Sequence, residues 1–218
     1  MKTINSILFA TLLLTAQTAL TQGFINLNFE SANVAAYGPG PTGVPTTNGI
    51  PGWTAYIFGN PQSYIFYNTL SLGAASVDLQ GTNSGFTPIQ GRFFVLLQGN
   101  SGGQPISAGI GQTGQIPMDA LALTFWGISG QSNVTFNGQV LNVNRIGTTG
   151  SYGIYGADIS AYAGQTGELL FTAYAAQWQY VDNIQFLSTP IPEPGSLALA
   201  ALGAVLVGGR CWRKHHSQ

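Results

Sequence analysis

The chain has 218 residues, of which 6% are charged and 44% hydrophobic, and its formal net charge at pH 7 is −1. Residues 23–189 hold six acidic residues against two arginines, which gives −4 for this region. We expect no nucleic-acid partner, because phosphate recognition needs a basic patch. The same region has no histidine and no cysteine, which excludes Ser-His-Asp and Cys-His catalysis and most catalytic zinc sites there.

Residues 1–22 predict a secretory signal peptide. Lys2 supplies a positive start, Ile7 to Leu14 form a short apolar run, and small residues from Ala16 onward suit a cleavage site. The alternative is an uncleaved anchor, but the apolar run is too short to span a membrane. We therefore expect residues 23–189 to be exported as one extracellular domain.

The start of this domain shows a strict alternation of apolar and amide side chains. Ile25, Leu27 and Phe29 would share one face, so the pattern predicts a half-buried strand over Phe24–Glu30. The stretch Tyr37–Gly52 is rich in glycine and proline and predicts a long loop.

The remainder of the domain contains short apolar or aromatic runs with glycine-rich turns and no helical periodicity. Asn137-Gly138 predicts a β-hairpin, because both residues tolerate the positive φ of a type I′ turn. About ten strands favour an all-β fold, a jelly-roll β-sandwich. The further strands are expected at Trp53–Phe58, Ser63–Tyr67, Ala74–Gln80, Arg92–Gln98, Ser107–Ile116, Leu121–Ile128, Asn133–Phe136, Gln139–Val143, Tyr152–Ile159, Glu168–Tyr174 and Tyr180–Leu187.

Four short segments carry a resemblance to the galactose-binding-like jelly roll, namely Asn28-Phe29-Glu30, Ala157-Asp158-Ile159-Ser160, Leu169-Leu170-Phe171 and Val181-Asp182-Asn183-Ile184. The resemblance implies a structural calcium ion beside the first and last strands, with Glu30 and Asp182 as ligands. Calcium prefers hard oxygen ligands of this kind. Asn183 stands where the family often has a second aspartate. The alternative is that both carboxylates cap turns at strand ends.

Aromatic side chains give the candidate sugar site. Trp178 and Tyr180 flank the polar residues Gln177 and Gln179, so we expect these two rings to be the most exposed and to offer a platform for a glycan. The alternative is that they fill the core, as aromatic residues of β-sandwiches usually do. The acidic residues fit no catalytic motif, and we expect no enzyme.

The last stretch, Pro190 to Gln218, has three zones. Pro192, Glu193 and Pro194 form a rigid entry, an apolar stretch centred on Leu197–Val207 follows, and Arg210, Arg213 and Lys214 close the segment. A helix over 195–209 would be about 22 Å long, against a bilayer core of about 30 Å. The basic residues favour the cytoplasmic side and would stop transfer. A buried core helix is the alternative, but this stretch has no polar stripe.

This three-part pattern resembles the PEP-CTERM sorting signal of exported bacterial proteins. The resemblance implies recognition by an exosortase, a membrane sorting enzyme, with cleavage near Pro192-Glu193-Pro194. The chain would first be held in the inner membrane by a transient transmembrane sorting helix. After cleavage, the domain would be transferred to the cell surface or the extracellular matrix.

The sequence thus predicts an exported surface or matrix protein with a structural or adhesive role in exopolysaccharide. A carbohydrate-binding module with a defined glycan site is the alternative. A secreted glycoside hydrolase is the third class, and it would need two facing carboxylates.

Overall fold

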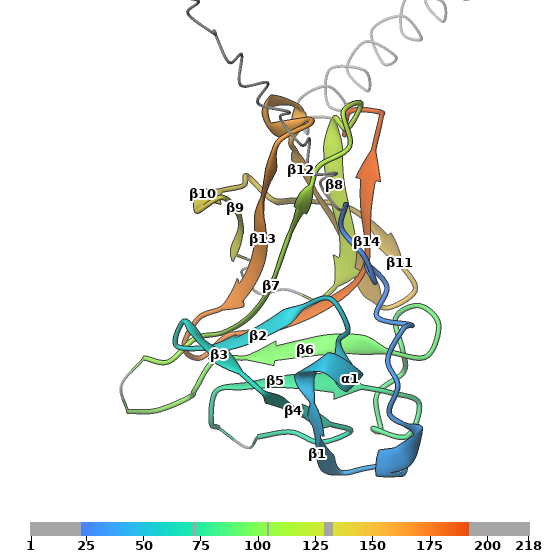
Figure 1. Cartoon of the computed structure of the whole chain (residues 1–218), viewed down its shortest axis with the longest axis vertical. Helices are drawn as coiled ribbons and strands as arrows, with labels where there is room; N and C mark the ends of the chain where they lie inside the picture. The colour runs from blue at the N-terminus through green and yellow to red at the C-terminus, as the bar shows by residue number, and fades with distance from the viewer. Residues whose placement is uncertain (1–22, 72, 104, 129–132, 192–218) are drawn as a thin grey trace, which may run out of the picture.

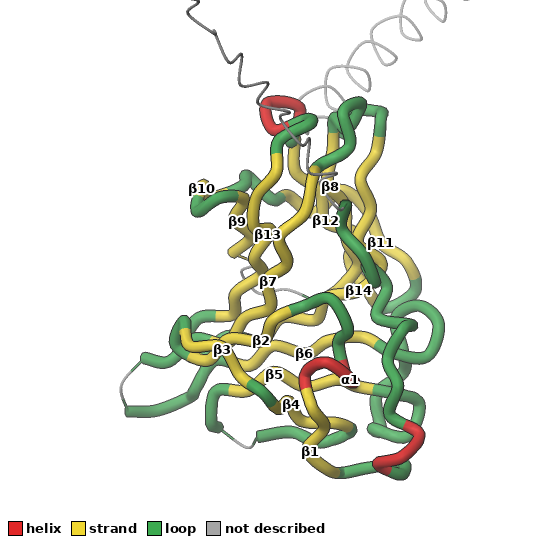
Figure 2. The backbone as a smooth tube through the Cα atoms, in the orientation of Figure 1, coloured by secondary structure: helices red, strands yellow, loops and turns green. Residues whose placement is uncertain are grey.

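The computed structural model describes residues 23–71, 73–103, 105–128 and 133–191 (Figure 1). The predicted signal peptide, 1–22, and the apolar helix over 195–209 lie outside these residues. Within them, no helix is long and apolar enough to cross a membrane. Strands and loops make up nearly all of the described chain, and the helical turns are short (Figure 2).

The strands form two sheets, so the predicted all-β sandwich is confirmed. Neighbouring strands are antiparallel except for β4 and β5, which are parallel. The eight-stranded sheet has the order β1 (Thr42–Pro45), β4 (Tyr64–Tyr67), β5 (Ser76–Gln80), β6 (Phe94–Gln98), β14 (Trp178–Leu187), β8 (Ala122–Gly127), β12 (Tyr152–Asp158) and β11 (Asn144–Thr149). The six-stranded sheet has the order β10 (Gln139–Val140), β9 (Asn133–Phe136), β13 (Thr166–Ala173), β7 (Ala108–Gln115), β2 (Thr54–Ile57) and β3 (Asn60–Gln62).

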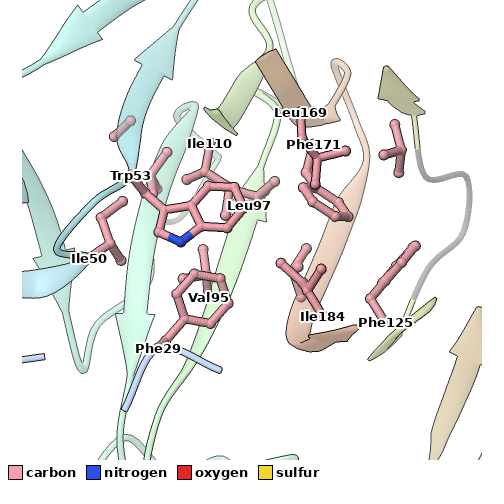
Figure 3. Close-up of a cluster of buried hydrophobic side chains, with 14 of the residues drawn as sticks. Phe29, Ile50, Trp53, Val95, Leu97, Ile110, Phe125, Leu169, Phe171 and Ile184 are labelled. Carbon is pink, nitrogen blue, oxygen red and sulfur yellow. The ribbon is translucent and has the colours of Figure 1, made fainter. Parts of the chain in front are cut away.

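The core lies between the two sheets and is rich in aromatic rings (Figure 3). The Trp53 ring lies 5.7 Å from Phe29 and 6.2 Å from Phe171 between ring centroids. Phe125 of the other sheet meets Phe171 edge-on at 5.1 Å. Large buried rings of this kind supply much of the apolar area removed from water, so the domain needs no disulfide to hold its sheets together.

In strand β13, buried core residues alternate with residues on the outer face of the smaller sheet. Leu169, Phe171 and Ala173 are buried in the core, while the alternate residues Glu168 and Leu170 are half-buried on the outer face of the sheet. This alternation follows from the two-residue period of a strand. It turns Glu168 away from the core and toward the neighbouring strand β7.

The prediction of a strand over Phe24–Glu30 is wrong. Asn26 and Phe29 have φ values of 50° and 56°, and this left-handed conformation breaks an extended chain. The Asn26 side-chain oxygen accepts a hydrogen bond from the Ser31 N–H at 3.0 Å, which closes a turn. Asparagine tolerates this conformation and bonds to nearby backbone. Just before this segment, Gly23 forms an isolated bridge to Gln115 of β7.

The prediction of a long loop over Tyr37–Gly52 is also wrong in part, because this stretch contains regular secondary structure. It contains β1, the edge strand of the larger sheet, and the short helix α1 (Thr46–Gly49). Two further helical turns are η1 (Ala35–Tyr37) and η2 (Ser160–Tyr162). The predicted hairpin is confirmed, because Asn137 and Gly138 have φ values of 49° and 75° between β9 and β10.

The loop over residues 81–92 covers part of the outer face of the larger sheet. Its Phe86 packs edge-on against Phe94 of β6 at 6.3 Å and Tyr180 of β14 at 5.9 Å. Every residue of β6 is buried, with the core on one side and this loop, together with Leu70 and Tyr152, on the other. The predicted central, buried strand over Arg92–Gln98 is thereby confirmed from Phe94 onward, whereas Arg92 is exposed and precedes the strand.

The described chain begins and ends at the same end of the domain, the upper end in Figure 1. Gly23 bridges Gln115, the last residue of β7. At the close of β14, the Leu187 carbonyl accepts the Leu121 N–H at 2.7 Å, next to the turn between β7 and β8. The other end of β7, at Gly109, lies beside β2.

Candidate functional site

The structure separates the two aromatic residues that the sequence groups together. Trp178 begins β14 and is 49% exposed, as expected, whereas Tyr180 is only 8% exposed. The expectation that Tyr180 is exposed is wrong, because the loop 81–92 lays Phe86 over its ring. Gln179 between them is fully buried rather than a surface amide. Trp178 keeps its predicted glycan role as a prediction, without Tyr180 as a neighbouring platform.

The structure does bring Glu30 and Asp182 together, on the segment 90–93. Glu30 Oε1 accepts hydrogen bonds from the N–H groups of Arg92 at 2.6 Å and Phe93 at 2.9 Å. Its Oε2 accepts from the Arg92 guanidinium at 3.3 Å. Asp182 accepts the Gln90 N–H at 2.8 Å and the Asn183 N–H at 2.6 Å, one on each oxygen.

The surroundings of Asp182 disfavour its charged form. Burial raises the pKa of this carboxyl to about 7, its two backbone hydrogen bonds act in the opposite direction, and the negative charge of Glu30 adds a smaller rise. Each oxygen of the pair already accepts an N–H group. Among the described residues, no group of three or more His, Cys, Asp or Glu side chains could hold a metal. This arrangement favours the capping alternative, and calcium binding stays a prediction.

Chelation separates these two possibilities. The calcium prediction implies that EDTA lowers the melting temperature of the protein and that Glu30→Ala removes this response, because an ion bound only to the folded state stabilises it. Capping implies equal melting temperatures with and without EDTA. It also implies a lower melting temperature for Glu30→Ala in both conditions, since three N–H groups lose their acceptor. Thermal unfolding of both proteins with and without EDTA is the measurement.

A groove on the outer face of the six-stranded sheet is a stronger candidate site than either predicted one. It has a volume of about 230 Å³ and runs across β2, β7 and β13. We call it the Tyr56–Glu168 groove, after the two side chains that meet in it. It is lined by Tyr56, Gly59, Ser107, Gly109, Glu168, Leu170 and Thr172.

A hydrogen bond crosses the floor of the groove. The Tyr56 hydroxyl donates to Glu168 Oε1 at 2.9 Å. Partial burial, the hydrogen bond to Glu168 and the negative charge of that carboxylate together raise the pKa of Tyr56 above its ordinary value of 10.0. Tyr56 therefore keeps its proton at physiological pH and directs it at Glu168.

Gly111 of β7 makes room for this pair, and Gly109 of the same strand lies close to the backbone of β13. A Cβ atom at Gly111 would lie 2.7 Å from Glu168 Oε1 and 3.1 Å from the Tyr56 ring. At Gly109 it would lie 2.8 Å from the Phe171 carbonyl oxygen. Side chains at these positions would fill the groove, and glycine in a strand often marks such close approaches. These glycines are visible in the sequence of the strand predicted over Ser107–Ile116. From the sequence alone they argue only against a regular strand, and they do not indicate a groove.

The comparisons with known proteins bear on the tail. Residues 190–214 match the PEP-CTERM protein-sorting motif, so the predicted sorting signal is confirmed. The motif implies an exported protein that is sorted by an exosortase. Pro192, Glu193 and Pro194 lie in the matched range and outside the described residues, as do the basic residues Arg210, Arg213 and Lys214. A search of curated proteins returns no match.

Eighteen chains of solved structures match the domain distantly. A structure of TmCBM61 with β-1,4-galactotriose has 15% identity over 76% of this chain and 98% of that chain, with a TM-score of 0.39. A cyclase from Fischerella sp. TAU has 14% identity, coverages of 76% and 94%, and a TM-score of 0.41. A family 11 carbohydrate-binding module from Clostridium thermocellum, with a mixed-linked tetrasaccharide, has 11% identity, coverages of 69% and 96%, and a TM-score of 0.38. Likenesses this distant identify no ligand and no activity.

Proposed function

We propose that this chain is a protein of the bacterial cell surface or extracellular matrix whose β-sandwich binds polysaccharide in the Tyr56–Glu168 groove. The PEP-CTERM motif supports export, and the acidic, amide-rich domain suits a hydrated matrix. Polysaccharide binding is compatible with a structural or adhesive role. A surface protein that binds a matrix polymer also attaches this polymer to the cell surface.

The groove carries this proposal because it combines an aromatic ring with oxygen acceptors. Sugars present apolar C–H faces and polar hydroxyl edges, so their sites pair an apolar platform with a few polar groups. Tyr56 and Leu170 supply the apolar part. Glu168, Ser107 and Thr172 supply oxygen atoms for hydroxyl groups. The volume of about 230 Å³ suits one sugar ring of a longer chain that continues over the open surface.

Before it reaches the surface, the chain would pass through a membrane-anchored stage. The apolar stretch over 195–209 would hold it transiently in the inner membrane, and an exosortase would cut near Pro192-Glu193-Pro194. Transfer to the cell surface or matrix would follow. The membrane is then a temporary partner, and polysaccharide is the lasting one.

A hydrolase is a weaker proposal for the same groove. Glycoside hydrolysis uses two carboxyl groups about 5–9 Å apart. Within the part of the chain that the structure describes, Glu168 is the only carboxylate that lines the groove. We therefore retain the proposal of a binding protein and not an enzyme.

Replacing Tyr56 by alanine is expected to weaken glycan binding about tenfold, because loss of the ring removes about 1.4 kcal/mol of contact. A glycan array with the purified full-length chain identifies the ligand, and isothermal titration calorimetry measures the affinity. Tyr64→Ala is the matched control, since Tyr64 is an exposed tyrosine of β4 in the other sheet. Unchanged binding by Tyr56→Ala, or loss of binding only in Tyr64→Ala, would place the site elsewhere.

A further inference from the structure

The polar groups at the floor of the Tyr56–Glu168 groove accept hydrogen bonds and have few protons to offer a ligand. An ionised carboxylate such as Glu168 is only an acceptor. Tyr56 has one hydroxyl proton and donates it to Glu168 Oε1, so toward a ligand its oxygen can only accept. Strand β7 pairs with β2 on one side and β13 on the other, which occupies its backbone N–H groups. The Ser107 and Thr172 hydroxyls can each donate one proton, so it is the Tyr56–Glu168 pair that needs donors from a ligand.

The groove also has an uncompensated negative charge. Among the described residues, the salt bridge between Arg92 and Glu30 is the only one. The other arginine of the domain, Arg145, lies on β11, the outermost strand of the eight-stranded sheet. Glu168 is thus half-buried in a groove with a phenol as its partner and with no cation from the part of the chain that the structure describes. A neutral ligand would leave this charge unbalanced.

We propose that the groove binds a protonated amino group, and that the ligand is a polysaccharide of amino sugars with free amino groups. This inference rests on the proposed glycan-binding function and specifies its ligand. An ammonium group brings three N–H donors and one positive charge, which match the acceptors and the charge of Glu168. The face of the Tyr56 ring adds a favourable contact with a cation. Thr172 and Ser107 add hydroxyl oxygens at the same groove.

Calorimetry with three oligosaccharides of equal length, made of glucosamine, N-acetylglucosamine or glucose, tests the inference on the full-length chain. We expect the glucosamine oligomer to bind at least about tenfold tighter than the other two at mildly acidic pH, which corresponds to about 1.4 kcal/mol. This preference should shrink as pH rises through the pKa of the amine, because the ammonium loses its charge. Added salt should also reduce it.

Glu168→Gln is the informative variant. The amide oxygen can still accept the Tyr56 hydroxyl proton, so the groove keeps its shape while its charge is removed. We expect this variant to bind all three oligomers with similar affinity. Asp119→Asn is the matched control, because it makes the same charge change at an exposed position outside the groove. It should keep the full preference for glucosamine.

The remaining outcomes separate the inference from the function. Equal binding of the three oligomers by the unmodified chain would overturn the amino-group inference and leave glycan binding standing. Equal loss of preference in Glu168→Gln and Asp119→Asn would also overturn it, since overall charge would then explain the result. Binding of a blocked lysine as tight as that of the glucosamine oligomer would overturn the amino-sugar class. If no glycan binds at all, the proposed function fails and the inference fails with it.

Discussion

Replacing Asp78 by asparagine is expected to stabilise the domain at neutral pH and to remove much of its pH dependence. Asp78 lies on β5, is fully buried, and accepts one hydrogen bond from Ser76 Oγ at 2.6 Å. Its other oxygen has no hydrogen-bond partner among the described residues. Burial raises the pKa of this carboxyl from 3.8 to about 7, and the Ser76 hydrogen bond offsets only part of that rise.

The sign of the effect follows from the raised pKa. Below about pH 4 the carboxyl is protonated in both the folded and the unfolded chain, so it causes no difference. Between about pH 4 and pH 7 the unfolded chain loses this proton more readily than the folded chain, and the folded state loses stability as pH rises. The interval from 3.8 to about 7 corresponds to a loss on the order of 4 kcal/mol. Asp182, with its pKa also raised to about 7, contributes in the same direction.

Urea unfolding at several pH values between 4 and 8 measures this effect. Asp78→Asn should flatten the pH profile and raise the free energy of unfolding most at the upper end, because an amide has no charge to bury and can still accept from Ser76. Asp119→Asn, at an exposed position, is the control and should leave the profile unchanged. A profile for Asp78→Asn that runs parallel to that of the unmodified chain would contradict the expectation.

Replacing Glu193 by alanine is expected to block sorting almost completely, so that the uncut precursor accumulates in the membrane. Glu193 is the single charge of the motif entry and lies within the matched range 190–214. The apolar stretch that follows is unchanged in this variant, and insertion into the membrane should therefore proceed. Mass spectrometry of the membrane and surface fractions measures the two forms. Asp119→Asn, in the β-domain, should be processed normally.

Replacing the basic residues of the tail should disturb sorting in a different way from Glu193→Ala. Each positive charge costs about 2.5–3.5 kcal/mol at the membrane centre, so Arg210, Arg213 and Lys214 together resist being pulled through. Replacing all three by serine should let the chain pass and be released without processing. Recovery of an intact peptide ending at Gln218 from the surface fraction of the unmodified strain would contradict sorting by cleavage.

The fold was largely predictable where short apolar runs stand between glycine-rich turns. Glu168–Tyr174, with the run Leu169 to Phe171, was expected as a strand, and β13 runs from Thr166 to Ala173. Strict alternation of side chains was a poorer guide, since it predicted a strand over Phe24–Glu30 that does not form. An alternating pattern carries no information on backbone conformation. It therefore could not show that Asn26 takes a left-handed conformation and accepts a hydrogen bond from the Ser31 N–H. Side-chain pattern indicates which face would be apolar, and local asparagine chemistry decides whether the chain is extended.

The candidate site was less predictable, because it depends on contacts between distant residues. Tyr56 and Glu168 are 112 positions apart, and only the pairing of β2 and β13 with β7 brings them together. The alternate glycines at Gly109 and Gly111 were the available signal. The prediction that Tyr180 is exposed also failed because of a distant contact. The loop that buries Tyr180 shows no regular pattern in the sequence, so its position over β14 could not be predicted.

The position of the groove on the smaller sheet matters for a protein that is anchored by its C-terminus. The described chain ends just after β14 of the larger sheet, where Ile191 lies against Gly156 of β12, whereas the groove lies on the outer face of the smaller sheet. Any pull from a bound polymer would therefore have to pass from one sheet to the other before it reached the anchor. The packed rings between the sheets, where Phe171 of β13 meets Phe125 of β8, would thus serve as the mechanical link between polymer and anchor.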